Sequence, residues 1–179
     1  MHGIIFRELK KYVVDKHGKT TWTRLLVDAG IDGKVFLPIQ TYVDAEMLAL
    51  VAGAAKESGV TANELLEYFG AFIVADLLQT YRSAIVPDWK TLELLEHTEA
   101  MIHRVVRQRD PTAQPPALDV QRTGPSTLTI SYSSARKLCA LARGIIRGVA
   151  EHYAQRVQIE ESTCMLRDDP QCTLNVTVH

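Results

Sequence analysis

The segment Tyr132-Ser133-Ser134-Ala135-Arg136 carries the most suggestive chemistry in the sequence. Tyr132, Ser134 and Arg136 are two residues apart where a predicted strand runs into a predicted helix, so their side chains are expected to point the same way. Two hydroxyl groups and a guanidinium that converge suit a carboxylate or a phosphate, because arginine donates a bidentate pair of hydrogen bonds. The start of a helix adds backbone amides and a positive dipole end. The alternative is an ordinary helix start, with Ser134 as a cap and Arg136 in solvent.

A second candidate is His103, which lies in the apolar helical stretch EAMIHRVV. A single histidine among methionine, isoleucine and valine is usually a core or boundary residue. It can also be a metal ligand, which requires a neutral imidazole on a rigid element that faces an apolar cavity. A helix of this composition can form such a wall, so the residue alone leaves both interpretations open.

The third candidate is a set of thiols formed by Cys139, Cys164 and Cys172. Cys139 follows the motif arginine by three residues, and the other two flank the turn of a predicted final hairpin. An odd number of cysteines argues against a secreted disulfide framework, and thiols that converge in this way suggest zinc. The alternatives are three buried free thiols, or a redox-active pair of Cys164 and Cys172.

The N-terminal part of the chain, which would carry His103, is predicted to be helical. Apolar residues recur with helical period in several stretches, which cover residues 4–13, 22–29, 45–58, 64–81 and 91–109. Asp44 is expected to cap the helix that ends at Gly59, and Thr61 with Glu64 forms a capping box for the next helix. These helices form an N-terminal subdomain over residues 1–110.

The C-terminal part changes character after the proline-rich segment DPTAQPPA, which cannot be helical. Alternating patterns predict strands around a single amphipathic helix: residues 118–123, 127–132, 156–163 and 172–178 for the strands, and 134–155 for the helix. The prediction is therefore one α/β (α+β) domain over residues 1–179. Its helical subdomain packs over a C-terminal subdomain, residues 111–179, with a four-stranded antiparallel sheet and a long helix.

The composition excludes several classes of protein. Twenty basic and 21 acidic residues give a net charge of −1, which disfavours nucleic-acid binding by bulk phosphate neutralisation and electrostatic anchoring to a membrane. No apolar run approaches the roughly 18 residues needed to span a bilayer, and the N-terminal segment has no signal-peptide pattern. We therefore expect a cytoplasmic protein.

The Y-x-S-x-R pattern, with a helical histidine about thirty residues upstream, resembles the H-NOX family of haem nitric oxide/oxygen-binding sensor domains. The segments HGIIFRELKKYV, TANELLEYFGAF and QIEESTCMLRDDPQC and the paired prolines also have counterparts there, so the resemblance covers essentially the whole chain. It implies a haem b between the two subdomains. His103 would be the proximal iron ligand, Tyr132, Ser134 and Arg136 would bind the propionates, and Pro116 would press on the porphyrin and hold it out of plane.

The resemblance also implies which gases the haem binds. Oxygen-binding members place a tyrosine five residues after the motif arginine, and Leu141 occupies that position here. The other positions that align with the distal wall are the aliphatic residues Ile5, Leu9 and Ile73, which also suit plain core packing. Bound oxygen is held by a distal hydrogen-bond donor, which NO and CO need much less. We therefore expect binding of NO and CO and no stable oxygen complex.

A subset of H-NOX proteins binds a structural Zn²⁺ through three cysteines and a histidine, and this chain resembles that subset. Cys139, Cys164 and Cys172 match the three thiols, but Glu161 stands where the subset has its histidine. A carboxylate can ligate zinc through oxygen, although it is less common in structural sites. His152 is the other candidate for the fourth ligand.

The resemblance implies a stand-alone bacterial NO sensor without enzymatic activity. NO would bind the iron opposite His103 and break the iron–histidine bond, so that the porphyrin relaxes against Pro116 and the subdomains rotate. The signal would pass to a separate histidine kinase or cyclic-di-GMP enzyme. The alternative from another class is a haem-free zinc or thiol module that acts as a redox switch or scaffold. A haem peroxidase is disfavoured because no distal histidine and arginine pair is evident.

Overall fold

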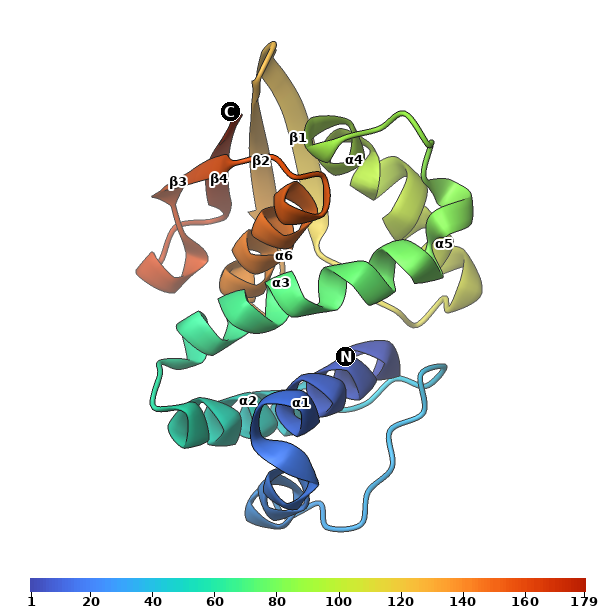
Figure 1. The fold of residues 1–179 in the computed structure, drawn as a ribbon, viewed down its shortest axis with the longest axis vertical. Helices are drawn as coiled ribbons and strands as arrows, with labels where there is room; N and C mark the ends of the chain where they lie inside the picture. Colours follow the sequence, from blue (N-terminus) through green and yellow to red (C-terminus); the bar gives the residue numbers. More distant parts are fainter.

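The computed structural model describes residues 1–179 apart from the side chain of Arg109. Its N-terminal part contains the long helices α2 (Asp44–Ser58) and α3 (Ala62–Thr80) and the longer segment α1 (Gly3–Asp28), which is kinked at Gly18, where the backbone is not helical (φ 83°, ψ 165°). Figure 1 shows α1 and α2 together at one end of the molecule, with α3 lying across them. Their apolar faces form one buried core in which Phe6 and Phe69 are completely covered. This arrangement confirms the expected helical N-terminal part.

The ends of these helices follow local chemistry in all but one case. Glu64 accepts a hydrogen bond from the Thr61 amide at 2.8 Å, and the Thr61 hydroxyl accepts one from the Glu64 amide, so the capping box is present. Helix α2 ends at Gly59 in the left-handed conformation (φ 69°), as predicted. The prediction that Asp44 caps α2 is wrong: the cap is Val43, and Asp44 is the first helical residue. The terminal amino group of Met1 donates to its carboxylate at 2.6 Å and draws it away from the helix end.

The expected helix over residues 91–109 is present, but its middle has a different winding. It consists of α4 (Thr91–His97), a π-helical turn η2 (Thr98–His103) and α5 (Arg104–Arg109). Single π-helical turns inside α-helices are rare and frequently mark functional sites. His103 is the last residue of this turn.

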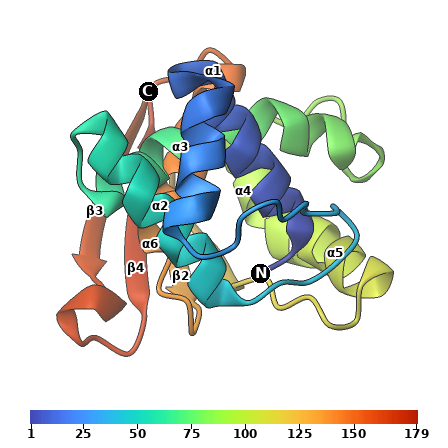
Figure 2. The ribbon, with the colours of Figure 1, turned by 90° about the horizontal axis from the view of Figure 1, so that it is seen from below.

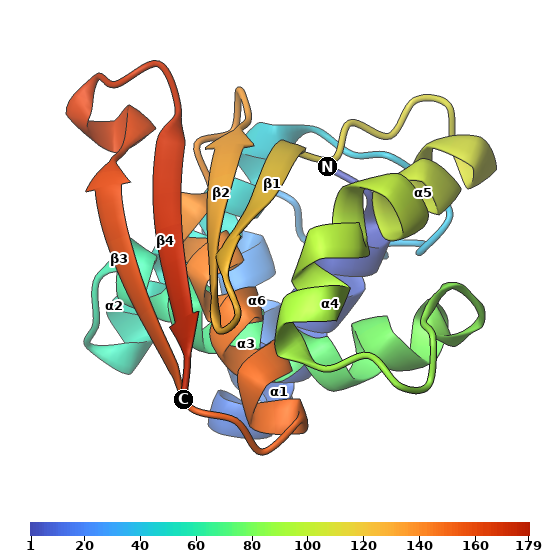
Figure 3. The ribbon, with the colours of Figure 1, turned by 90° about the horizontal axis from the view of Figure 1, so that it is seen from above.

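The C-terminal part is a four-stranded antiparallel sheet in the order β1-β2-β4-β3. Its strands are β1 (Ala117–Gly124), β2 (Thr127–Ser133), β3 (Val157–Thr163) and β4 (Cys172–Val178). Figure 3 shows α4 and α5 beside the β1 edge and α6 (Cys139–His152) against one face of the sheet. Ile146 of α6 packs there on the apolar side chains of β2 and β4. The α/β class predicted from the sequence is therefore confirmed.

Helix α6 begins later than the predicted residue 134. Residues 134–138 form a turn in which Lys137 has a left-handed backbone (φ 50°). The Lys137 amide donates to the Ser134 carbonyl at 3.0 Å, which closes the turn. Amphipathic spacing continues through this turn, so the sequence pattern alone extends the helix too far. The consequence is that Ser134 and Arg136 lie on a tight connection between β2 and α6.

The two parts of the molecule meet where α3 crosses α6. Glycines let the helices approach closely, because a Cβ atom on Gly144 would lie 2.1 Å from the Glu67 carbonyl oxygen and one on Gly70 2.5 Å from the Leu141 carbonyl oxygen. At the other side of the molecule the N-terminus approaches the end of α5, where His2 Nε2 lies 3.6 Å from Asp110 Oδ2 (Figure 2). Among the described residues, no helix combines the length and apolar character needed to cross a membrane.

Candidate functional site

Two adjoining cavities, of about 160 and 210 Å³, lie between the helices and the sheet. They share a set of lining residues and therefore form one space: Leu77, Ile102, His103, Pro116, Tyr132, Ala142 and Ile145. The lining is mostly aliphatic and comes from α3, η2, α6 and the first two strands. Protein cores contain few voids larger than a water molecule, and an apolar cavity of roughly 150 Å³ already binds benzene. A space of this size can hold an apolar group larger than benzene.

His103 provides a potential metal ligand on the wall of both cavities. Its side chain is 13% exposed, and its Nδ1 lies 2.7 Å from Glu99 Oε2. A carboxylate can only accept a hydrogen bond, so this contact places the ring proton on Nδ1 and leaves the lone pair on Nε2. Burial lowers the pKa of His103 and outweighs the raising effect of Glu99. The imidazole is therefore neutral at pH 7, as iron ligation requires.

The tyrosine, serine and arginine of the Y-x-S-x-R motif all line the larger cavity, as their spacing predicts. Tyr132 is 3% exposed, and burial raises its pKa to about 12, so its phenol remains a hydrogen-bond donor. The Ser134 hydroxyl accepts a hydrogen bond from the Arg136 amide at 3.3 Å. Because α6 begins only at Cys139, Ser134 does not cap it, and the alternative of an ordinary helix start does not apply.

The guanidinium of Arg136 is held at the cavity edge with part of its donor capacity unused. Its Nη1 donates to the Gln114 carbonyl at 2.5 Å, and its Nε lies 2.9 Å from Asp44 Oδ2. The buried Nε nevertheless has no partner in hydrogen-bond geometry among the described residues. Buried charges normally pair with an opposite charge and are hydrogen-bonded. An unsatisfied guanidinium nitrogen beside a large apolar cavity therefore fits the carboxylates of haem.

The residues predicted for the distal wall are divided between the cavity and the core. Ile5 and Leu141 line the larger cavity, and Pro116 lines both cavities. Leu9 and Ile73 are fully buried in the core shared by α1, α2 and α3 and are absent from the described lining. For these two positions the alternative of plain core packing describes the structure.

Sequence reasoning missed several other residues that line the larger cavity: Met1, His2, Thr41, Tyr81 and Gln114. They come from the N-terminus, from the loop before α2, from the end of α3 and from the segment before β1. No periodic pattern marks them, because their positions depend on long-range contacts such as the bridge between His2 and Thr41. An arrangement of this kind has no local signal in the sequence.

The three cysteines and Glu161 converge as predicted, with one potential ligand atom from each lying within 4.8 Å of the others. The Sγ atom of Cys164 lies 3.6 Å from that of Cys139 and 3.8 Å from that of Cys172, and all three thiols are free and buried. Burial raises the pKa of Cys139 to about 12 and also raises that of Cys172. A metal ion at this cluster must therefore displace protons from the thiols.

Glu161 is the fourth member of this thiol cluster. Arg143 donates to its Oε1 at 2.9 Å, and its Oε2 lies 3.7 Å from an Arg167 nitrogen. His152, the other candidate, ends α6 with its ring 4.9 Å from that of Tyr153 and is not a member of the cluster. The geometry is that of a Cys₃Glu set, which suits a borderline metal ion such as Zn²⁺.

Comparisons with solved structures show the same fold in H-NOX proteins. The chain is similar to an H-NOX protein from S. oneidensis solved in the Fe(II)NO ligation state, with a TM-score of 0.94, 26% identity and coverage of 100% of this chain and 99% of that one. It is also similar to the H-NOX domain from Shewanella oneidensis in the Fe(II)CO ligation state, with a TM-score of 0.91, 26% identity and coverage of 100% and 99%. An unliganded Fe(II) H-NOX protein from K. algicida, at 23% identity, a TM-score of 0.87 and coverage of 100% and 97%, supports the fold alone.

Comparisons by sequence agree with the structural ones. The chain is 28% identical over 160 residues to the soluble guanylate cyclase gcy-35 of Caenorhabditis elegans, a match that covers 84% of this chain. It spans only 22% of that longer protein. A family model described as haem-NO-binding matches residues 2–161. Because this family model matches most of the chain, the chain belongs to the haem-NO-binding, or H-NOX, family.

Proposed function

We propose that this protein is a haem-based nitric oxide sensor in which His103 is the proximal iron ligand. The observation that carries the proposal is a buried histidine on the wall of a large apolar cavity, with its Nδ1 held 2.7 Å from Glu99 Oε2 and its pKa lowered by burial. The unsatisfied Arg136 nitrogen at the edge of the same cavity supports it, because haem is apolar apart from two carboxylates. We propose that this haem is of type b.

Each residue of the site has a separate part in the proposed mechanism. Arg136, Tyr132 and Ser134 donate hydrogen bonds to the propionates and so hold the ring edge. Pro116 presses on the ring face, and His103 anchors the ring to η2. When bound, haem would supply an iron atom with a position for a gas, and His103 would hold that iron. Release of His103 from the iron on binding of NO would free the helix that carries it to move.

Gas selectivity is assigned to the aliphatic residues of the lining. Leu141, five residues after Arg136, offers no hydrogen bond to a bound gas, and neither does Ile5. Oxygen on ferrous iron depends on a donor far more than NO or CO does. We therefore propose binding of NO and CO without a stable oxygen complex.

The output is assigned to a separate protein in the cytoplasm, without catalysis by this domain. NO favours the packing in which His103 is free, and a ligand shifts an equilibrium only by its differential affinity for the two states. A histidine kinase or a cyclic-di-GMP enzyme that binds only one of the two packings would convert this shift into a signal.

The proposal is tested by replacing the proximal ligand. His103→Ala is expected to lose haem, and free imidazole, which can fill the vacated space, is expected to restore it. His97→Ala is the matched control, because His97 lies on the same helix but stacks on Trp89 at 4.5 Å and does not line the described cavities. Absorption spectra after haem reconstitution report both results. Full haem retention by His103→Ala without imidazole would refute the assignment.

A second candidate is a haem-free zinc or thiol module that acts as a redox switch or scaffold, and the Cys₃Glu cluster favours it. The cluster joins β3 and β4 to the start of α6, so a structural Zn²⁺ is also compatible with a haem sensor. The purified protein separates the two candidates. The module predicts one equivalent of zinc, no Soret band and an oxidant response that depends on Cys164 and Cys172. The sensor predicts a Soret band whether or not zinc is bound.

A further inference from the structure

Glu99, His103 and Arg107 form a chain of side chains along the helix that carries the proposed iron ligand. They are four residues apart, which places them on one face. Glu99 accepts from His103 Nδ1 through Oε2 at 2.7 Å and from Arg107 Nη2 through Oε1 at 2.5 Å. The carboxylate therefore connects the imidazole directly to a guanidinium.

We propose that Glu99 is a positioning residue that sets the strength of the iron–histidine bond, and that Arg107 limits its effect. This inference rests on the proposed function, in which His103 binds the haem iron. A carboxylate that accepts the second ring proton of a ligating histidine fixes the tautomer and the ring orientation and raises the basicity of the ligand. Glu99 occupies that place in this chain.

The surroundings of the three side chains indicate how strong this effect is. The imidazole is 13% exposed, so its hydrogen bond with Glu99 is poorly screened by water. Glu99 and Arg107 are 30% and 43% exposed and lie toward the surface. The guanidinium draws negative charge from the same carboxylate, so Glu99 is a weaker acceptor for the ring proton than it would be alone.

Glu99 and Arg107 are thus expected to have opposite effects on how readily NO releases His103 from the iron. Without the Glu99 charge, the imidazole is a weaker donor to iron, and the bond opposite NO breaks more readily. Without the Arg107 charge, Glu99 withdraws the ring proton more strongly, and the bond breaks less readily. A purely structural role predicts no such opposition.

Resonance Raman spectra of the reduced holoprotein measure the iron–histidine stretching frequency directly. We expect a lower frequency in Glu99→Gln, which keeps an acceptor but loses the charge, and a higher frequency in Arg107→Ala. The midpoint potential is expected to rise in the first variant and fall in the second. Loss of the hydrogen bond in Glu99→Ala is expected to weaken haem retention by about 10-fold or more.

Glu96→Gln is the matched control, because it removes the same charge from the same helix. Glu96 pairs with Arg122 at 3.0 Å rather than with the imidazole. The iron–histidine stretching frequency of Glu96→Gln is therefore expected to equal that of the unsubstituted protein. An iron–histidine band that Glu99→Gln leaves unmoved, or that both glutamine variants shift alike, overturns the role of Glu99. The absence of that band in the unsubstituted reduced protein overturns the proposed function itself, so the two failures are distinguishable.

Discussion

At the scale of single residues, the site combines a buried nitrogen that the fold itself does not satisfy with a buried phenol that stays protonated. The buried Arg136 Nε lacks a hydrogen-bond partner among the described residues, although Asp44 lies close to it. The buried Tyr132 hydroxyl keeps its proton far above pH 7. Leaving the Arg136 nitrogen without a hydrogen bond in an apolar cavity is unfavourable unless a ligand pairs with it. These residues are therefore expected to contribute more to haem binding than to stability of the empty fold.

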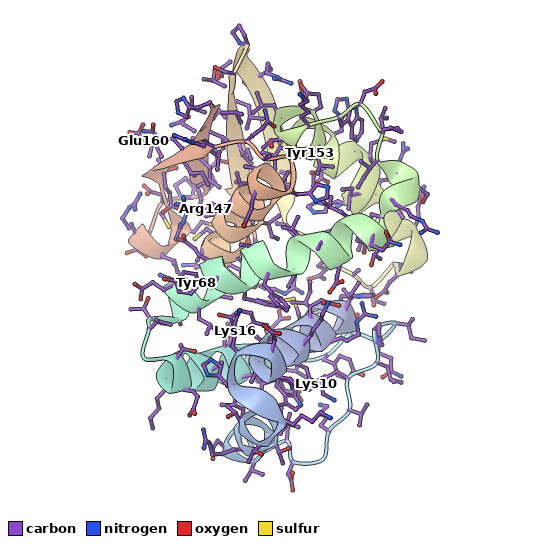
Figure 4. The ribbon with its side chains drawn as sticks, in the orientation of Figure 1. Lys10, Lys16, Tyr68, Arg147, Tyr153 and Glu160 are labelled. Atoms are coloured by element: carbon purple, nitrogen blue, oxygen red, sulfur yellow. The ribbon has the colours of Figure 1, made fainter. Side chains whose placement is uncertain are left out.

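Replacement of Arg136 tests this expectation. Hydrogen bonds to charged groups are worth about 1.5–3 kcal/mol, so Arg136→Ala is expected to lower haem affinity by roughly 10- to 100-fold. The haem affinity of Arg136→Lys should lie between those of the unsubstituted protein and Arg136→Ala, because lysine offers a point charge without the planar fork of arginine. Arg147→Ala is the control: Arg147, labelled in Figure 4, is an exposed arginine of α6 outside the described cavities. Haem transfer to excess apomyoglobin measures the affinities, and equal values for the two alanine variants would exclude a propionate role for Arg136.

Glu8 is a residue whose charge is unfavourable in the folded protein. Its carboxyl group on α1 is almost fully buried, and its Oε2 has no hydrogen-bond partner among the described residues. Burial raises the pKa of Glu8 above its ordinary 4.5; Arg7 opposes this increase, and the nearby Asp76 of α3 adds to it. A raised folded-state pKa means that the stabilising contribution is complete below pH 4.5 and is lost as the pH rises through the folded-state value.

Glu8→Gln, which stays neutral at every pH, is therefore expected to stabilise the protein at pH 7 by about 1 kcal/mol. The difference should shrink as the pH falls toward 4.5 and disappear well below it, where Glu8 is protonated in both states. Glu64→Gln is expected to behave in the opposite way, because hydrogen bonds from Thr61 lower the pKa of Glu64. Urea denaturation across this pH range measures both effects. A Glu8→Gln difference that does not depend on pH would contradict the account.

At the scale of elements, the crossing of α3 and α6 holds the molecule together, and three glycines make it possible. The helices touch backbone to backbone at Gly70, Gly144 and Gly148, where Cβ atoms would lie between 2.1 and 2.7 Å from carbonyl oxygens. Arg143 of α6 also pairs with Glu67 of α3 at 2.8 Å. This contact is therefore sensitive to an added side chain.

Gly144→Ala is expected to force the two helices apart and to destabilise the protein by about 1–3 kcal/mol. Gly53→Ala is the control, since Gly53 lies inside α2 and a methyl group there meets only the flexible Leu25 side chain. Alanine favours a helix over glycine by about 1 kcal/mol, so the control variant should be neutral or slightly stabilised. Chemical denaturation compares the two, and equal stability of Gly144→Ala and the unsubstituted protein would contradict the close packing.

Local patterns predicted the elements well where short-range chemistry decides them. The capping box at Thr61, the helix stop at Gly59 and the alternating strands all follow from a few adjacent residues. The prediction for Asp44 failed because the Met1 amino group, distant in sequence, binds its carboxylate. The late start of α6 and the π-helical turn before Arg104 also escaped prediction, since apolar spacing does not distinguish these windings from an α-helix.

The candidate site was predictable only in part, for a related reason. The motif residues converge because they flank a single strand end, and the thiol cluster converges because the final hairpin brings Cys164 and Cys172 to α6. Leu9 and Ile73 belong to the core instead of the cavity, and Tyr81 lines the cavity without any local signal. Which aliphatic residues face a cavity depends on helix rotation, which an apolar pattern does not define.

At the scale of the whole molecule, the proposed site lies between the helical part and the sheet-containing part, so a change at the site would affect how the two parts move relative to each other. The α3–α6 crossing fixes the parts at one point, and the cavities separate η2 and the N-terminus from the sheet elsewhere. His103 belongs to the helical layer, whereas Tyr132 and Arg136 belong to the sheet and its connection to α6. A group bound by all three residues joins the two parts, and release of His103 would loosen that link.

The absorption spectrum of the reduced protein tests the central claim most directly. The spectrum is recorded under inert gas, after addition of NO, and in air. The account predicts a five-coordinate high-spin ferrous haem that becomes a five-coordinate NO complex, with no stable oxygen complex in air. A stable oxygen complex, or a six-coordinate NO complex that retains His103, would contradict it.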